Sequence, residues 1–92
     1  MKKEDLKRAL RALKEEGYRL ITISVLPREK HFEVIYHLAR RNKVRNIRFF
    51  LQKNQVLPSV RDIFPNSWIY EWEEHEKTGI KVENAKRLFE IE

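Results

Sequence analysis

The residues whose side chains could support catalysis or metal binding are concentrated in one short segment, YEWEEHEKTGI at residues 70–80. It holds four glutamates and a histidine, and Glu71 and His75 have the i, i+4 spacing that places two side chains on one face of a helix. Neighbouring carboxylates can shift each other's pKa for acid–base catalysis, and Glu71 with His75 could hold a metal ion. A metal-dependent hydrolase is therefore one hypothesis for this chain.

Both kinds of site need more groups than the sequence supplies. A zinc site uses three or four converging ligands, and none of the three histidines has another histidine four residues away. Like charges on one exposed helix are expected to stay solvated and screened. The chain has no cysteine and two glycines, which excludes thiolate nucleophiles, cysteine-ligated clusters and a glycine-rich phosphate loop. We expect no catalysis by the chain alone, no cofactor and no metal.

Charge is distributed unevenly along the chain. Residues 1–61 have a balance of +10 and residues 62–92 a balance of −4, which together give the net +6. A basic body favours an anionic partner. The segment 44–52 mixes Arg45 and Arg48 with Phe49 and Phe50, as an RNA-binding sheet could. It lacks the glycines of an RNA-recognition motif, so a small RNA-binding module is the second hypothesis.

The elements that must position these residues begin with an amphipathic helix. Apolar residues recur at i, i+3, i+4, i+7 from Leu6 to Leu13, with Asp5 as the predicted N-cap and Gly17 as the C-terminal stop. Three segments rich in β-branched and aromatic residues then predict strands, at 19–26, 32–38 and 44–52. Alternation predicts that each of these sets shares one face of its strand: Ile21, Ile23 and Val25; Phe32, Val34, Tyr36 and Leu38; Ile47, Phe49 and Leu51.

A turn and a second helix follow the strands. Ser59 with Asp62 three residues later resembles a capping box and should open a short turn that Pro65 ends. A helix is predicted over residues 68–77, and a closing element over 82–91. Asn66 or Ser67 should cap this helix, and Gly79 should end it.

The whole chain predicts one domain, residues 1–92, of the α+β class. An N-terminal helix precedes a three-stranded, mostly antiparallel sheet, which a C-terminal helix and the short closing element complete. No apolar run approaches the length of a membrane span, and the N-terminus does not resemble a secretory signal, so we expect a cytoplasmic protein.

Aromatic side chains on the second helix suggest a contact surface. Trp68 and Trp72 are four residues apart and share a helical face. In so small a domain part of this face should stay uncovered, and an aromatic patch beside charges suits a protein interface. An isolated chain could cover it with a second copy of itself.

Two motifs resemble a known family. LPSVRDIFP at residues 57–65 and the segment 70–80 together resemble the thirty-kilodalton subunit of respiratory NADH–quinone oxidoreductase (complex I), and still more closely the equivalent subunit of membrane-bound, energy-converting hydrogenases. The family has a P-S-[IV]-x-D-[IV]-[FWY]-P element before a helix reading E-R-E-x-[HY]-D-x-F-G-I. The matching positions are Pro58, Ser59, Val60, Asp62, Ile63, Phe64 and Pro65, then Glu71, Glu73, His75, Gly79 and Ile80.

The resemblance implies an accessory subunit that carries no cofactor. Such a subunit packs against the large subunit in the cytoplasmic arm of a membrane complex, where it serves assembly. Trp72 replaces the family's arginine, Glu76 its aspartate and Thr78 its phenylalanine, which marks a divergent member with altered docking. The predicted subunit-interface residues are Pro58, Ser59, Asp62, Trp68, Glu71, Trp72, Glu73, His75 and Gly79.

Overall fold

Two helices and a three-stranded antiparallel sheet form the core of the computed structural model, which describes residues 2–83. The predicted α+β class is confirmed. The predicted closing element starts in a short strand, and its part from residue 84 onward lies outside the described residues. In chain order the elements are α1 (Lys3–Glu15), β1 (Arg19–Pro27), β2 (His31–Arg40), β3 (Lys43–Gln52), β4 (Val56–Leu57), α2 (Ser67–Thr78) and β5 (Lys81–Val82).

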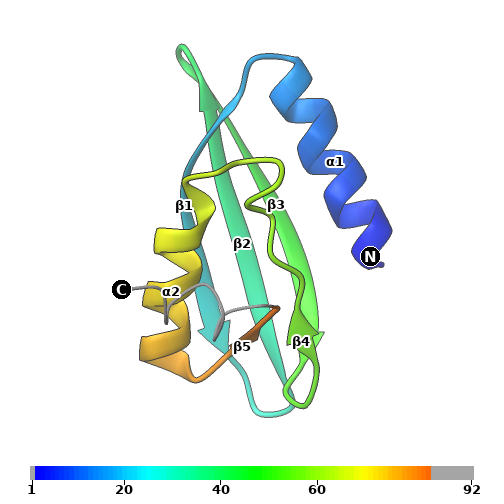
Figure 1. The fold of residues 1–92 in the computed structure, drawn as a ribbon, viewed down its shortest axis with the longest axis vertical. Helices are drawn as coiled ribbons and strands as arrows, with labels where there is room; N and C mark the ends of the chain where they lie inside the picture. The colour runs from blue at the N-terminus through cyan, green and yellow to red at the C-terminus, as the bar shows by residue number, and fades with distance from the viewer. Residues whose placement is uncertain (1, 84–92) are drawn as a thin grey trace.

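The sheet has the order β1-β2-β3, and each neighbouring pair is antiparallel. Figure 1 shows α1 beside β3 and α2 over β1. The sequence did not predict the short parallel pair between β4 and β5, which joins the segment before α2 to the segment after it. Because β4 precedes α2 and β5 follows it, their pairing brings the segments on the two sides of α2 together.

The predicted side-chain faces of β2 and β3 are confirmed, whereas that of β1 is wrong at one end. Ile23 and Val25 are both buried, but Ile21 is exposed and Leu20 is buried in its place. The register of β1 against β2 shifts between Leu20 and Thr22. A bulge adds one residue to a strand and moves the side chains before it to the opposite face. A strict alternation counted from Val25 therefore assigns Leu20 and Ile21 to the wrong sides.

At α1 the predicted N-cap is wrong, and the predicted C-terminal stop is confirmed. The N-cap is Lys2 rather than Asp5, because the helix starts earlier than the capping pattern predicted. The carboxylate of Asp5 instead accepts a long hydrogen bond from the Lys2 N–H, 3.4 Å away. Gly17 has a positive φ of 93°, the conformation of a helix stop that glycine adopts at little cost.

Candidate subunit interface

Glu71 joins α2 to the segment before it. Its carboxylate is buried and accepts hydrogen bonds from the Ser59 hydroxyl and the Val60 N–H, each 2.9 Å long. The prediction that the glutamates of α2 stay solvated is therefore wrong for Glu71. It is also wrong for Glu74, which is buried as well. The two carboxylates lie on the inner face of α2 with Ser67, at i, i+4 and i+7.

The surroundings of Glu71 change its acidity. Burial raises the pKa of this carboxyl above its ordinary value, although the hydrogen bonds from Val60 and Ser59 oppose the shift. The hydroxyl of Tyr36 is buried nearby on the sheet, and burial together with the negative charge of Glu71 raises its pKa too. The two groups thus form a polar region inside the apolar core, where the hydrogen bonds of Glu71 specify how α2 sits on the sheet.

Glu74 and Asn66 occupy the open edge of β1. A Glu74 carboxylate oxygen accepts a 2.6 Å hydrogen bond from the Val25 N–H, and the Asn66 side chain donates to the Leu20 carbonyl at 3.1 Å. Asn66 is the N-cap residue of α2, as one of the two predicted candidates, but its side chain caps no helical N–H. An edge strand with free backbone groups can recruit foreign strands. These two side chains fill such positions on β1 and fix α2 alongside it.

The loop before α2 is tied to α1. Asp62 lies 3.4 Å from the Lys7 ammonium and 3.3 Å from the Arg11 guanidinium, and Lys14 donates a 2.6 Å hydrogen bond to the Ile63 carbonyl. The predicted capping box is wrong, because Ser59 donates to Glu71 and Asp62 faces α1. The predicted turn is present at residues 61–63. Pro58 and Ser59 are buried, so they can support an interface only through the shape of this loop.

The C-terminal end of α2 has a dense set of local hydrogen bonds. His75, which is half-buried, donates from Nδ1 to the Ile80 carbonyl at 2.7 Å. Its ring also lies against Trp72, with 5.9 Å between the ring centroids. Gly79 adopts the left-handed conformation predicted for it, with φ 77°, and its N–H donates to the His75 carbonyl. The chain therefore turns sharply from α2 into β5.

Replacing Gly79 by alanine should lower the free energy of unfolding by about 1 kcal/mol, because a Cβ strains the left-handed conformation. A Cβ at this position would meet no atom within 4 Å, so the cost comes from the backbone alone. Denaturant unfolding measures it. Gly79→Asn is the matched control and should cost less, since asparagine tolerates this conformation better. Equal losses in the two variants would contradict the backbone explanation.

The outward face of α2 has a different character. Trp68 and Ile69 are 43% and 44% exposed, large values for apolar side chains of this size. Trp72 is half-buried, and Glu73 and Glu76 are exposed beside it. We call these five residues the α2 outer surface. Adjacent exposed apolar side chains often mark an interaction site, and aromatic residues are enriched at protein interfaces.

The other two hypotheses find less support. Within residues 2–83, no three His, Asp or Glu side chains converge as a metal site would require. Glu71 points inward to the loop, and His75 uses Nδ1 for Ile80. On β3, Phe49 is buried and Arg48 pairs with Glu33. Phe50 is exposed as an RNA-binding sheet would need, but these two neighbours in the basic-aromatic pattern are engaged within the chain.

The outer face of the sheet has two rows of interacting polar side chains that the sequence did not predict. Glu33 pairs with Arg28 at 3.3 Å and also with Arg48. Burial by itself would raise the pKa of Glu33, but the two arginines outweigh it and hold the pKa below its ordinary value. A further row joins Ser24, His37 and Asn46 across the three strands. Cross-strand pairing creates these rows, and only the strand register could have revealed them.

The comparison with protein families decides the identity. The family described as respiratory-chain NADH dehydrogenase, 30 Kd subunit, matches residues 1–91. The chain belongs to this family. The 30 kDa subunit is part of a multi-subunit oxidoreductase, and the resemblance to the complex I subunit inferred from residues 57–65 and 70–80 is confirmed. No curated protein matches the chain significantly.

Family membership gives the two motifs a structural role. In this 30 kDa-type subunit Ser59 of the first motif and Glu71 of the second bind each other, so the motifs form one unit. None of the helices within residues 2–83 has both the length and the apolar character needed to cross a membrane. The chain is a complex I 30 kDa-type subunit, and the other subunits of such a complex are its natural class of partner.

Proposed function

We propose that the chain is a non-catalytic scaffold subunit that docks on the large subunit of a membrane-associated electron-transfer complex. The complex is of the NADH–quinone oxidoreductase type or of the related membrane-bound hydrogenase type, and the chain binds on its cytoplasmic side. Family membership supports the kind of assembly.

The two faces of α2 support docking through this helix. The inner face is bound to the rest of the chain by hydrogen bonds to Glu71 and Glu74, whereas the outer face exposes Trp68 and Ile69. A helix fixed this firmly presents a rigid surface, which reduces the entropy lost on binding. Trp68, Trp72 and Glu73 are the proposed contacts. Glu71, Ser59, Pro58, Asp62, His75 and Gly79 act indirectly, because they hold α2 and the loop in place.

Deleting the gene in the source organism should remove the large subunit from the assembled complex, because a scaffold subunit is needed for assembly rather than for chemistry. Expression of the wild-type chain should restore it. Native electrophoresis of membranes, with detection of the large subunit, measures this. The purified chain should oxidise neither NADH nor hydrogen. An intact complex in the deletion strain, or turnover by the isolated chain, would contradict the proposal.

A further inference from the structure

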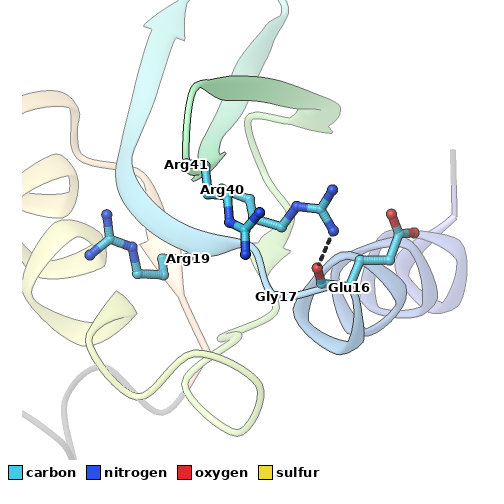
Figure 2. Close-up of a pocket in the computed structure, with 5 residues that line it drawn as sticks. All are labelled: Glu16, Gly17, Arg19, Arg40 and Arg41. Atoms are coloured by element: carbon cyan, nitrogen blue, oxygen red, sulfur yellow. Dashed lines mark hydrogen bonds between the residues drawn. The ribbon is translucent and has the colours of Figure 1, made fainter.

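An arginine-lined pocket lies at the end of the molecule where α1 meets the sheet. Its volume is about 510 Å³, and its lining consists of Glu16, Gly17, Arg19, Arg40 and Arg41. We call it the basic pocket (Figure 2). Its lining comes from the residues just after α1, from the start of β1, and from the end of β2 with the turn that follows it. Among residues 2–83, no carboxylate forms an ion pair with any of its three arginines.

The arginines differ in their freedom. Arg40 donates a 2.8 Å hydrogen bond to the Glu16 carbonyl and lies over the Tyr18 ring, 5.4 Å from its centroid. Figure 2 shows Arg40 reaching toward Glu16 while Arg19 extends in the opposite direction. Arg40 is thus held in place, and Arg19 and Arg41 are left to bind. Guanidinium groups suit carboxylates and phosphates because two parallel N–H donors match two oxygens.

The backbone at Arg41 is also unusual. Arg41 has a φ of 55° in the two-residue turn between the paired residues Arg40 and Lys43. Glycine or asparagine normally occupies such a position, since a side chain there is strained. Non-glycine residues held in this conformation are concentrated at functional sites. The turn therefore places an arginine at a position where local structure alone would favour another residue.

An apolar groove adjoins the basic pocket and shares Arg19 with it. The groove has a volume of about 440 Å³ and runs between the end of α1, β1 and the loop before α2. Its lining includes Tyr18, Ile21 and Phe64, and it reaches Asn66, the N-cap residue of α2. A ligand that fills both must combine a negative charge with apolar groups.

The arginines of the basic pocket attract any anion, so the negative groups beside them bear on the choice between a carboxylate and a phosphate. The pocket lies at the C-terminal end of α1, where the helix dipole is negative and repels a multiply charged anion. Phosphate sites more often use the opposite end of a helix. Glu16 adds another negative charge to the lining. A single carboxylate suffers less from both effects.

We propose that the basic pocket and the apolar groove bind a segment of the partner large subunit in which a carboxylate stands beside apolar side chains. The inference rests on the proposed function, which supplies the partner, and adds a second contact beyond the α2 outer surface. The carboxylate pairs with Arg19 and Arg41, and the apolar side chains lie in the groove against Tyr18 and Phe64.

Zero-length crosslinking tests this contact in the assembled complex. An Arg41→Lys variant places an amine in the basic pocket, and a carbodiimide then joins it to any carboxylate in direct contact. Mass spectrometry should find position 41 linked to an aspartate, a glutamate or the C-terminus of the large subunit, beside apolar residues. Arg8→Lys is the matched control, because Arg8 is exposed on α1 outside the pocket, and it should give no such link.

A charge-reversal variant provides a second test of this contact. An Arg19→Glu/Arg41→Glu chain should retain about tenfold less large subunit in affinity purification, since like charges then face each other. Arg8→Glu should retain the wild-type amount, and circular dichroism should show that both chains fold. A wild-type chain that retains the large subunit without a crosslink or a charge effect would overturn this inference alone. Failure of the wild-type chain to retain it would overturn the proposed function.

Titration with inorganic phosphate tests the alternative that the basic pocket is a phosphate site. Arginine Nε–H resonances of Arg19 and Arg41 in the isolated chain should stay unchanged by phosphate at constant ionic strength. Saturable shifts of both would identify a phosphate site and overturn the assignment to a carboxylate.

Discussion

Replacing Glu71 by alanine should destabilise the chain by about 3 kcal/mol. The substitution leaves the buried Val60 N–H and the Ser59 hydroxyl without their acceptor and opens a cavity under α2. Denaturant unfolding of the purified chain measures the loss. Glu73→Ala is the matched control on the same helix, because Glu73 is exposed, and it should change stability by less than about 0.5 kcal/mol.

A Glu71→Gln variant separates the shape of the side chain from its charge. The folded pKa of Glu71 is raised, so its contribution to stability is fully present below the unfolded value of 4.5 and is lost as pH rises through the folded value. Glutamine does not titrate. The stability of Glu71→Gln relative to wild type should therefore increase as pH rises above 4.5.

The pH comparison isolates Glu71 from the opposing effect of Glu33. The pKa of Glu33 is lowered, so its contribution is present above its unfolded value and lost as pH falls. Because both proteins contain Glu33, this contribution cancels in the difference. A difference that stays constant with pH, or an alanine variant as stable as wild type, would contradict the role assigned to Glu71.

Much of the sheet could be predicted from the sequence because its side chains alternate. Phe32, Val34, Tyr36 and Leu38 repeat with a period of two, and burial of that face follows directly. The bulge between Leu20 and Thr22 could not be predicted, since it depends on how β1 pairs with β2. The parallel β4–β5 pair was also missed, because two residues on each side are too short to give a pattern.

In the candidate site too, the features that depend on tertiary contacts could not be predicted from the sequence. Helical spacing correctly placed Trp68 and Trp72 on one outward face of α2. It did not predict that Glu71 and Glu74 are buried, because the charges of the helix glutamates suggested that all of them stay solvated. Their burial follows from backbone donors at Val25 and Val60, which only the folded chain brings near. The basic pocket likewise joins Arg19 to Arg41 across two strands, a proximity that depends on strand pairing.

Replacing Trp68 by glutamate should reduce binding of the large subunit by about thirtyfold or more, which corresponds to about 2 kcal/mol, the loss expected for a central aromatic contact. The side chain is 43% exposed and does not belong to the buried core, so the unfolding free energy should change by less than about 1 kcal/mol. Binding and stability would thus separate, unlike in Glu71→Ala, where the fold itself is weakened.

Docking on the large subunit through the α2 outer surface can be measured by affinity purification. Tagged wild-type, Trp68→Glu and Phe50→Glu chains are purified from the source organism, and the large subunit retained by each is quantified. Phe50 is an exposed aromatic residue on β3, away from α2, and serves as the matched control. We expect the wild-type and Phe50→Glu chains to retain the large subunit and the Trp68→Glu chain to lose it. Equal retention by all three, or loss with Phe50→Glu alone, would show that the α2 outer surface is not the docking site.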